Sequence, residues 1–237
     1  MTGGAPQVSV VIPVHDAGAL LADALASVAR QGMPELEVLV IDDGSHDAPE
    51  RWVESSRLPV RLIRQENGGP SAARNVGIAA CRGRYVAFLD ADDIWPRRAL
   101  AGLRARIDAD GGADVVQGHV RRFRAAGAHE VAWPFTIVGP PRLGFNVGSA
   151  LFRREVFNRI GPFDETMRTG EDVDIWVKVR EAGLRHAVLA DTTLLYRRGN
   201  GGIIERLAPP DRSAEHLRRW ATILHGSLAR RRRAGAP

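Results

Sequence analysis

Apolar runs alternate with segments of helical periodicity along the N-terminal part of the chain. Such alternation is typical of βα units that build a parallel sheet. Glycine and proline separate the predicted elements from one another. The pattern predicts strands over 8–14, 38–41 and 60–63, a fourth strand that ends at Leu89, and helices over 21–31, from Pro49 and over 71–81.

The pattern loosens beyond Ile107, where 115–116 and 118–123 are short strand candidates. Proline and glycine are scattered over 133–148, so an irregular stretch is expected there. Regularity returns over 152–160, in a helix over 171–181 and in a strand over 187–190. A last helix over 213–230 places apolar side chains on one face, which suits a core or interface stripe. These side chains are Leu217, Trp220, Ile223, Leu224 and Leu228.

Polar and acidic side chains follow each predicted strand of the first half. In order along the chain they are His15, Asp42 and Asp43, Asn67, and Asp90 to Asp93. The carboxyl ends of parallel strands lie at one edge of a sheet, and open α/β sheets bind their ligands there. Separate segments are therefore predicted to converge on one crevice.

The segment Asp90-Ala91-Asp92-Asp93 has the DXD pattern and comes directly after a buried run. Like charges so close repel, so a carboxylate cluster usually binds a metal or keeps a proton on one member. Oxygen ligands suit Mg²⁺ or Mn²⁺, which often bridge carboxylates to substrate phosphates. The alternative is a solvated acidic turn before a helix that begins at Pro96. These residues alone support both interpretations equally.

Composition narrows the class of protein. The 237 residues suffice for one large domain or two small ones, and 44% hydrophobic with 26% charged residues excludes a disordered or fibrous chain. The net charge of +5 rests on arginine, with Lys178 as the sole lysine, which indicates a GC-rich bacterial genome rather than nucleic-acid binding. The single cysteine, Cys81, excludes an intrachain disulfide and a zinc site built from cysteines.

The two ends of the sequence carry no clear targeting signal. Residues 1–7 lack the charged start and apolar core of a signal peptide. No apolar run is long enough to cross a bilayer, and we expect a cytoplasmic protein. The run Arg230–Arg233 suits peripheral contact with anionic lipid or a solvated tail, and the tail is favoured because terminal charge runs are usually disordered.

Four short motifs occur in a fixed order along the chain. They read VSVVIP (8–13), VIDDGS (40–45), ARNVG (73–77) and FLDADD (88–93), and each alone is weak. In this order they resemble family 2 glycosyltransferases of the GT-A fold, from about Val8 to Tyr196. A fifth segment, from Phe152 to Trp176, is similar to the acceptor half of that family.

The resemblance implies one α/β domain with a mostly parallel central sheet, flanking helices and a C-terminal amphipathic helix. It implies a nucleotide-sugar half over 7–110, an acceptor half over 111–200, and a helix with a basic tail over 201–237. The expected activity is inverting, metal-dependent transfer of a sugar from a nucleotide-diphosphate sugar, with UDP favoured and Mn²⁺ or Mg²⁺ as cofactor.

The resemblance also implies site residues. It places the nucleotide at Pro13, His15, Asp43, Arg74 and Asp90. Asp43 would bond the base, Asp90 the ribose, and Asp92 the metal that neutralises the leaving diphosphate. Glu171 and Asp172 form a second acidic pair, in which Asp172 is the expected general base.

Structural alternatives stay open for several of these side chains. Arg74 suits a salt bridge on its helix as well as it suits a phosphate. Asp172 alone would suit a cap at the start of its helix. Trp176 is expected in the core more than at a sugar, so Trp133 and Phe135 are better candidates for stacking on an acceptor.

Departures from the family pattern and rival functions remain. Many relatives have a histidine after the Tyr-Arg of the final strand, but 196–200 has none. Asn200, water, His216 or His225 would take its place, or the metal would bind more weakly.

A nucleotidyltransferase should show an arginine- and lysine-containing loop, which 15–18 lacks. A degenerate sugar-nucleotide or glycan-binding module should lose Asp92 or Asp172. Peptide, lipid, glycan and natural-product acceptors all stay open.

Overall fold

The computed structural model describes residues 5–109, 112–125, 135–167, 169–199, 220–227 and 229–230. Its N-terminal part contains every predicted strand and helix of the βα series. These elements are β1 (Val8–Val14), α1 (Leu20–Ala29), β2 (Leu36–Asp43), α2 (Glu50–Glu54), β3 (Val60–Gln65), α3 (Gly69–Ala80), β4 (Tyr85–Phe88) and α4 (Ala99–Asp108).

The second half is more regular than predicted. One strand, β5 (Val115–Arg124), replaces the two short candidates, and β8 (His186–Arg197) is far longer than 187–190. The stretch predicted to be irregular contains β6 (Thr136–Arg142), which pairs with β5 at the sheet edge, where prolines are tolerated. The other elements are η1 (Val147–Ser149), β7 (Ala150–Arg153), α5 (Glu155–Ile160) and α6 (Glu171–Glu181).

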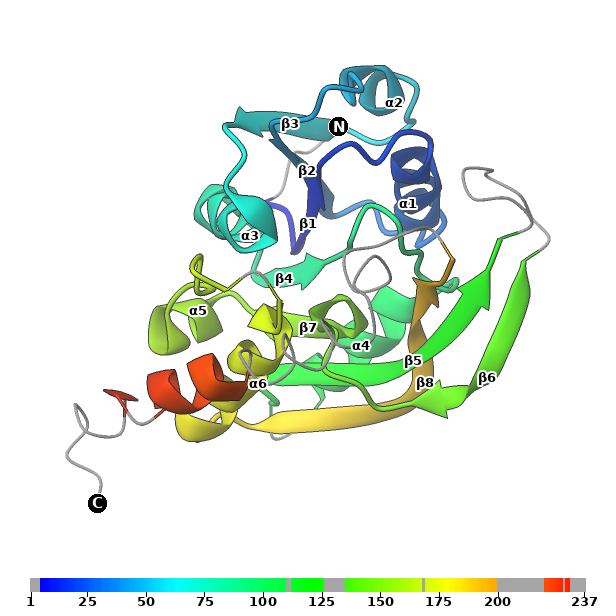
Figure 1. The fold of residues 1–237 in the computed structure, drawn as a ribbon. Coiled ribbons are helices and arrows are strands. Elements are labelled where there is room, and N and C mark those ends of the chain that lie inside the picture. Colours follow the sequence, from blue (N-terminus) through cyan, green and yellow to red (C-terminus); the bar gives the residue numbers. More distant parts are fainter. Residues whose placement is uncertain are drawn as a thin grey trace.

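All these strands share one mixed sheet with helices on both faces (Figure 1). The order is β3-β2-β1-β4-β7-β5-β6, with β8 also beside β5. Strands β1 to β4 are parallel to their neighbours among themselves, whereas β7 runs antiparallel to β4 and β5. Both predicted halves thus contribute to the same sheet, and their division into donor and acceptor halves stays a prediction.

Alternation along β1 divides the core into two layers. Val8, Val10 and Ile12 pack under α1 and α4, while Val11 packs under α3, α5 and α6. Because both faces of the central strands are covered, these strands are mostly apolar. Ser9 of β1 and Glu37 of β2 are buried exceptions, and the Ser9 hydroxyl donates a hydrogen bond to the Glu37 carboxylate. The predicted site residues Asp42 and Asp43 are the last two residues of β2.

Gly77 marks the closest approach of α3 to the sheet. A Cβ atom there would lie 2.3 Å from Val11 Cγ1, so the helix would have to shift. We expect Gly77→Ala to lower the free energy of unfolding by about 1–3 kcal/mol in urea titrations. Gly102→Ala on α4 is the matched control, since its Cβ would meet its nearest neighbour, Leu189, at 3.4 Å. Equal losses in both variants would contradict this packing argument.

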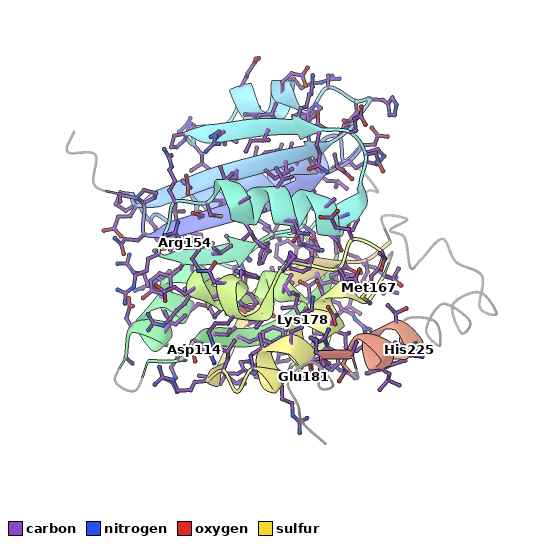
Figure 2. All side chains as sticks on the ribbon, turned by 90° about the vertical axis from the view of Figure 1, so that its left-hand side faces the viewer. Asp114, Arg154, Met167, Lys178, Glu181 and His225 are labelled. Carbon is purple, nitrogen blue, oxygen red and sulfur yellow. The ribbon has the colours of Figure 1, made fainter. Side chains whose placement is uncertain are left out.

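The described part of the last helix, 220–227 with 229–230, packs beside α6 (Figure 2). Ile223 is buried, but Trp220 and Leu224 are 38% and 58% exposed, so these two side chains are not part of the core. The alternative of an interface stripe stays a prediction. The helix packs against the rest of the protein mainly through Ile223, and the side chains on either side of Ile223 are exposed to solvent. Leu217 and Leu228 lie outside the described residues. His225 is exposed on this helix.

Arg230, the first residue of the predicted basic tail, forms ion pairs with α6, and the prediction for the rest of the tail stays untested. Its guanidinium pairs with Glu181 at 2.7 Å and with Asp174 at 3.3 Å. Arg231 to Arg233 lie outside the described residues. Among the residues the structure does describe, no helix is long and apolar enough to cross a membrane.

Candidate functional site

The ends of β1, β2 and β3 bring three predicted polar residues together. The carbonyl oxygen of Asp43 lies 2.9 Å from His15 Nδ1 and accepts a hydrogen bond from Asn67 Nδ2 at 3.0 Å. His15 follows β1 directly and Asn67 follows β3, so the convergence expected from parallel strands is present. Pro13, two residues before His15, is only partly buried in β1.

The Asp43 carboxylate mainly orders the turn that leads into α3. It accepts hydrogen bonds from Gln65 Nε2 at 2.7 Å and from the backbone N–H groups of Gly68 and Gly69 at 2.8 Å each. Asp43 is 3% exposed. A carboxylate has about four acceptor positions, so a nucleobase would have to use the remaining one, on Oδ2.

Asp42, the neighbouring acid, faces a broad cavity at the end of β2. Its carboxylate accepts from the Ser45 N–H at 2.9 Å and from Arg64 Nε at 2.7 Å. The cavity beside it measures about 630 Å³, is open to solvent, and lies between the end of β2, Gly44 and Glu66. This space adjoins the His15 and Asn67 cluster on the same sheet edge.

Arg74 on α3 connects the two predicted acidic clusters. Its Nη2 donates to Asp90 Oδ1 at 2.7 Å, and its Nη1 lies 3.1 Å from Glu171 Oε1 and 3.9 Å from Asp172 Oδ1. The guanidinium is 3% exposed and lies over the ring of Phe163 at 5.5 Å. The structure shows the ion-pair network of Arg74, and its contact with a phosphate stays a prediction.

These carboxylates keep Arg74 charged. Burial alone would lower the pKa of the guanidinium, but Asp90, Asp172 and Glu171 raise it above its ordinary value. A single cation thus balances acids from the end of β4 and from the start of α6. This contact fixes the distance between the two predicted halves of the site.

Asp172 is a carboxyl group with an unusual affinity for protons. Burial raises its pKa to about 8, Arg74 opposes the rise, and Glu171 and Asp90 add to it. Its Oδ1 has no hydrogen-bond partner, and its Oδ2 accepts one long bond, 3.4 Å, from the Val147 N–H. The helix has Gly170 as its N-cap and no side-chain cap bond, and Asp172 lies in its first turn, where the helix dipole favours an acid.

The acidic turn after β4 is held from two sides. Arg74 holds Asp90, while the backbone N–H of Arg197 on β8 donates to Asp93 Oδ1 at 2.8 Å. The other oxygen of Asp93 is buried without a partner. Burial, with Asp92 and Asp90 nearby, raises the pKa of Asp93 well above its ordinary value.

The carboxylate oxygens of this turn could hold a hard cation only if the phosphates of a bound substrate supplied further ligands. In the described part of the chain, no group of three or more His, Cys, Asp or Glu side chains is arranged to hold a metal. Mg²⁺ commonly takes one or two carboxylates together with substrate phosphates and water. Asp92, which is partly exposed at this turn, would supply one carboxylate of such a partial shell, whereas Asp93 is buried. Asn200 and His216 lie outside the described residues.

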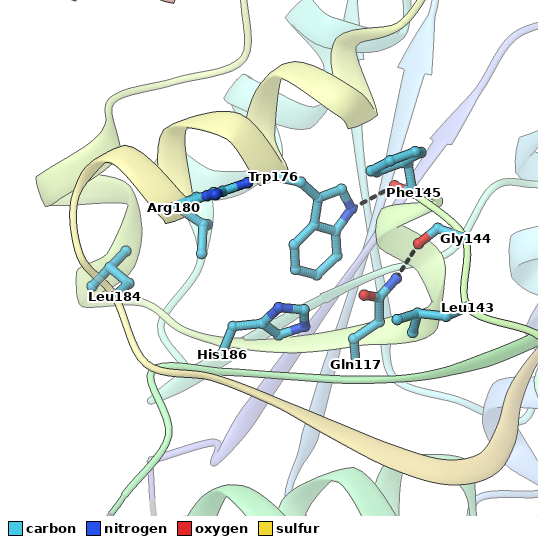
Figure 3. Close-up of a pocket in the computed structure, with 9 residues that line it drawn as sticks. Gln117, Leu143, Gly144, Phe145, Trp176, Arg180, Leu184 and His186 are labelled. Carbon is cyan, nitrogen blue, oxygen red and sulfur yellow. Dashed lines mark hydrogen bonds between the residues drawn. The ribbon is translucent and has the colours of Figure 1, made fainter. Parts of the chain in front are cut away.

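A pocket of about 390 Å³ lies beside α6 on the acceptor side (Figure 3). Trp176 Nε1 donates to the Phe145 carbonyl at 2.6 Å, and Gln117 Nε2 donates to the Gly144 carbonyl at 2.6 Å. Both bonds fix the segment that leads to Val147 and hence to Asp172. The lining residues are Gln117, Leu143, Gly144, Phe145, Trp176, Val179, Arg180, Leu184 and His186.

The aromatic residues predicted to stack on an acceptor occupy different places. Trp176 is 8% exposed and packs against His186 with ring centroids 4.8 Å apart, so little of its face is open. Phe135 packs against Phe123 at 5.1 Å, in a small cluster with Ile94 and Leu195, because β6 folds onto β5. Trp133 lies outside the described residues.

The sequence interpretation missed Phe145, which is 55% exposed at the mouth of the pocket. The available signal was an aromatic residue between Gly144 and Asn146 in a stretch of glycine and proline. It also missed the buried pair of Arg197 and Asp23, joined at 2.8 Å behind the acidic turn. No local pattern marks a pair so distant along the chain.

Comparisons with known proteins agree with this arrangement. Residues 9–161 match the family described as Glycosyl transferase family 2. The chain is 33% identical to the succinoglycan biosynthesis protein ExoO of Rhizobium meliloti, over 84% of this chain and 62% of ExoO. It is 27% identical to the uncharacterized glycosyltransferase EpsJ of Bacillus subtilis, over 90% of this chain and 67% of EpsJ.

A solved structure shares the fold. TarS 1–349 of S. aureus in complex with UDP-GlcNAc matches with a TM-score of 0.66 and 25% identity, over 81% of this chain and 59% of that chain. The chain therefore spans about two thirds or less of the length of these relatives. Since the matched segment covers more than half of the chain and carries the crevice described above, the protein belongs to glycosyl transferase family 2 and has the predicted GT-A fold.

Proposed function

We propose that the protein is an inverting, metal-dependent glycosyltransferase that moves a sugar from a UDP-sugar to an acceptor hydroxyl. The observation that carries the proposal is the placement of Asp172, a buried carboxyl group with a pKa of about 8, beside the acidic turn through one shared guanidinium, Arg74. The likeness to a TarS structure in complex with UDP-GlcNAc supports UDP as the nucleotide.

The donor nucleotide fits the edge formed by β1, β2 and β3. His15, Asn67 and the last acceptor position of Asp43 line this edge, and the open cavity beside Asp42 provides room for a nucleoside. The diphosphate would then lie at the acidic turn. When bound, Mn²⁺ or Mg²⁺ held by Asp92 and the phosphates would neutralise the negative charge of the leaving group.

Asp172 supplies the proton acceptor for the reaction. Its unpartnered Oδ1 takes the proton of the acceptor hydroxyl while that oxygen attacks the anomeric carbon. The sugar bond to the diphosphate breaks on the opposite side, so the configuration at the anomeric carbon inverts. A general base is most effective when its pKa lies near the working pH, and a value of about 8 meets that condition.

We place the acceptor against Phe145 and Leu143 at the mouth of the pocket in Figure 3. Phe145→Ala is expected to lower the rate of transfer about tenfold, because an aromatic contact with the acceptor is lost. The measurement is the initial rate with each glycan, lipid-linked, peptide or natural-product acceptor that the wild type glycosylates. UDP affinity should stay unchanged. Val138→Ala, on the exposed side of β6, is the control, and an equal effect there would contradict the placement.

The rival functions have weaker support. A nucleotidyltransferase or a degenerate binding module gains nothing from a base of raised pKa next to a metal-binding turn, and both Asp92 and Asp172 are retained. We place the reaction in the cytoplasm, where nucleotide sugars are available. Contact of the basic run with anionic lipid stays a proposal.

The direct test measures whether UDP is released and which anomer of the sugar product forms first. Wild-type protein is incubated with a panel of UDP-sugars, with Mn²⁺ or EDTA, and UDP release is followed together with the proton NMR signal of the first sugar product. Metal-dependent release and a product anomer opposite to that of the donor are expected. Retention of configuration would contradict direct displacement, and metal-independent release would contradict the role of Asp92.

A further inference from the structure

We infer that Arg197 is the positioning residue of the metal-binding turn and that it acts through Asp23 of α1. This inference rests on the proposed function, because it assigns the turn to a metal. Arg197 itself touches neither the proposed donor nor the reacting atoms. It holds the backbone from which Asp92 extends.

Three hydrogen bonds from Arg197 reach the elements around the turn. Its backbone N–H donates to Asp93 Oδ1 at 2.8 Å, its Nε donates to the Asp92 carbonyl at 2.7 Å, and its Nη2 donates to Asp23 Oδ2 at 2.8 Å. One residue thus binds the main chain of Asp92 and the side chain that follows it. The turn cannot rotate without breaking both bonds.

The guanidinium of Arg197 is enclosed. It lies over the ring of Phe123 at 4.8 Å, and the side chains of Arg197 and Asp23 are 3% and 10% exposed. A planar guanidinium can bond a carbonyl and a carboxylate at once with little loss of side-chain entropy, which an ammonium group cannot match. The enclosure leaves one orientation in which both bonds form.

Further backbone bonds join β8 to the residue after the turn. Ile94 and Leu195 exchange hydrogen bonds of 3.2 and 2.9 Å in an isolated antiparallel bridge. The far side of the turn is therefore fixed to β8, and Asp23 fixes Arg197 to the first turn of α1. Since α1 begins shortly after His15, the same network ties the metal-binding turn to the nucleotide end of β1.

Arg197→Gln tests the side chain while leaving the backbone bond to Asp93 in place. We expect Mn²⁺-dependent UDP affinity to fall about tenfold, as for the loss of a positioning contact outside the ligand shell of a metal. UDP binding measured in EDTA should be unchanged. Asp23→Asn should act in the same direction, and the double variant should be no weaker than Arg197→Gln alone, because both changes break one network.

Arg153→Gln is the matched control. Arg153 also donates to two backbone carbonyls, those of Ala113 at 2.9 Å and Ile107 at 3.0 Å, and lies over an aromatic ring, Tyr85, at 5.7 Å. It pairs with Tyr85 at the start of β4, at the opposite end of that strand from the acidic turn. This variant should lose stability without losing metal-dependent binding.

The experiment is calorimetric titration of UDP with Mn²⁺ and with EDTA, well below the thermal midpoint of each folded variant, with free Mn²⁺ followed by electron paramagnetic resonance. Selective loss of the Mn²⁺-dependent part in Arg197→Gln and Asp23→Asn is the expected result. Unchanged binding in both, or an equal loss in Arg153→Gln, would overturn the inference alone. Absence of UDP binding by the wild type would instead overturn the proposed function. Asp23→Asn decides the matter if Arg197→Gln does not fold.

Discussion

Asp172→Asn is expected to lower the rate of sugar transfer by at least about 100-fold while the protein stays folded, because a general base contributes about 10²–10⁴-fold. An amide cannot take the proton of the acceptor hydroxyl. The measurement is kcat/KM for UDP release with an acceptor, alongside circular dichroism. Glu155→Gln, in the first turn of the neighbouring helix α5 and exposed, is the control and should keep full activity.

The pH dependence of kcat/KM of the wild type should report the titration of Asp172. The pKa of Asp172 is about 8 in the folded protein against an ordinary 3.8, so kcat/KM should rise with pH and level off above about 8. Folding stability should show the opposite trend. The folded state holds a proton that the unfolded chain releases, so the contribution of Asp172 to stability is lost as pH rises between these values. A lower limb of kcat/KM near the ordinary value would contradict the assignment.

Arg74→Met should give the largest loss of stability. The substitution leaves Asp90, Glu171 and Asp172 without their shared cation in a largely buried place. Breaking a buried ion pair from one side costs about 3–5 kcal/mol, and we expect a loss of that size in urea unfolding at neutral pH. The loss should shrink as the pH is lowered, because protonated carboxyl groups no longer need the guanidinium.

Arg104→Met is the matched control for Arg74. Arg104 also pairs with two acids, Glu35 and Asp108, but these side chains are 49% and 39% exposed. Exposed ion pairs contribute about 0–1 kcal/mol, so a small effect is expected there. Similar losses for the two arginines would show that burial of Arg74 adds nothing and would contradict its role as the central cation.

The hydrophobic pattern correctly predicted those strands and helices whose apolar residues are the buried ones. The strand over 8–14 and the helix over 171–181 have the predicted bounds, because β1 is buried on both faces and α6 starts after a glycine. The order of polar residues after parallel strands predicted one crevice, and His15, Asp43 and Asn67 do meet there. The fold class followed from the same alternation.

Long-range pairing accounts for what the sequence did not predict. β6 forms despite Gly139, Pro140 and Pro141 because β5 offers a partner strand, and strand preference depends strongly on such context. The network of Arg197 joins residues at opposite ends of the chain. The Asp43 carboxylate bonds the start of α3, a contact set by loop geometry rather than by any motif.

The aromatic residues show the same limit. Periodicity on α6 places Trp176 toward the core, where it is buried, but periodicity says nothing about which loop aromatic lines a pocket. Phe145 lines the pocket because bonds from Trp176 and Gln117 fix the backbone of its segment. Hydrogen bonds from side chains to backbone carbonyls can involve any residue as acceptor, so no sequence spacing predicts them.

The most direct test of the central claim is calorimetric titration of UDP, GDP and dTDP, each with Mn²⁺ and with EDTA, against the wild type and Asp92→Ala. We predict that UDP binds with Mn²⁺, that EDTA weakens this binding, and that Asp92→Ala loses the metal-dependent part. Absence of nucleotide binding under every condition, or binding unaffected by both EDTA and Asp92→Ala, would contradict a metal-dependent UDP-sugar transferase.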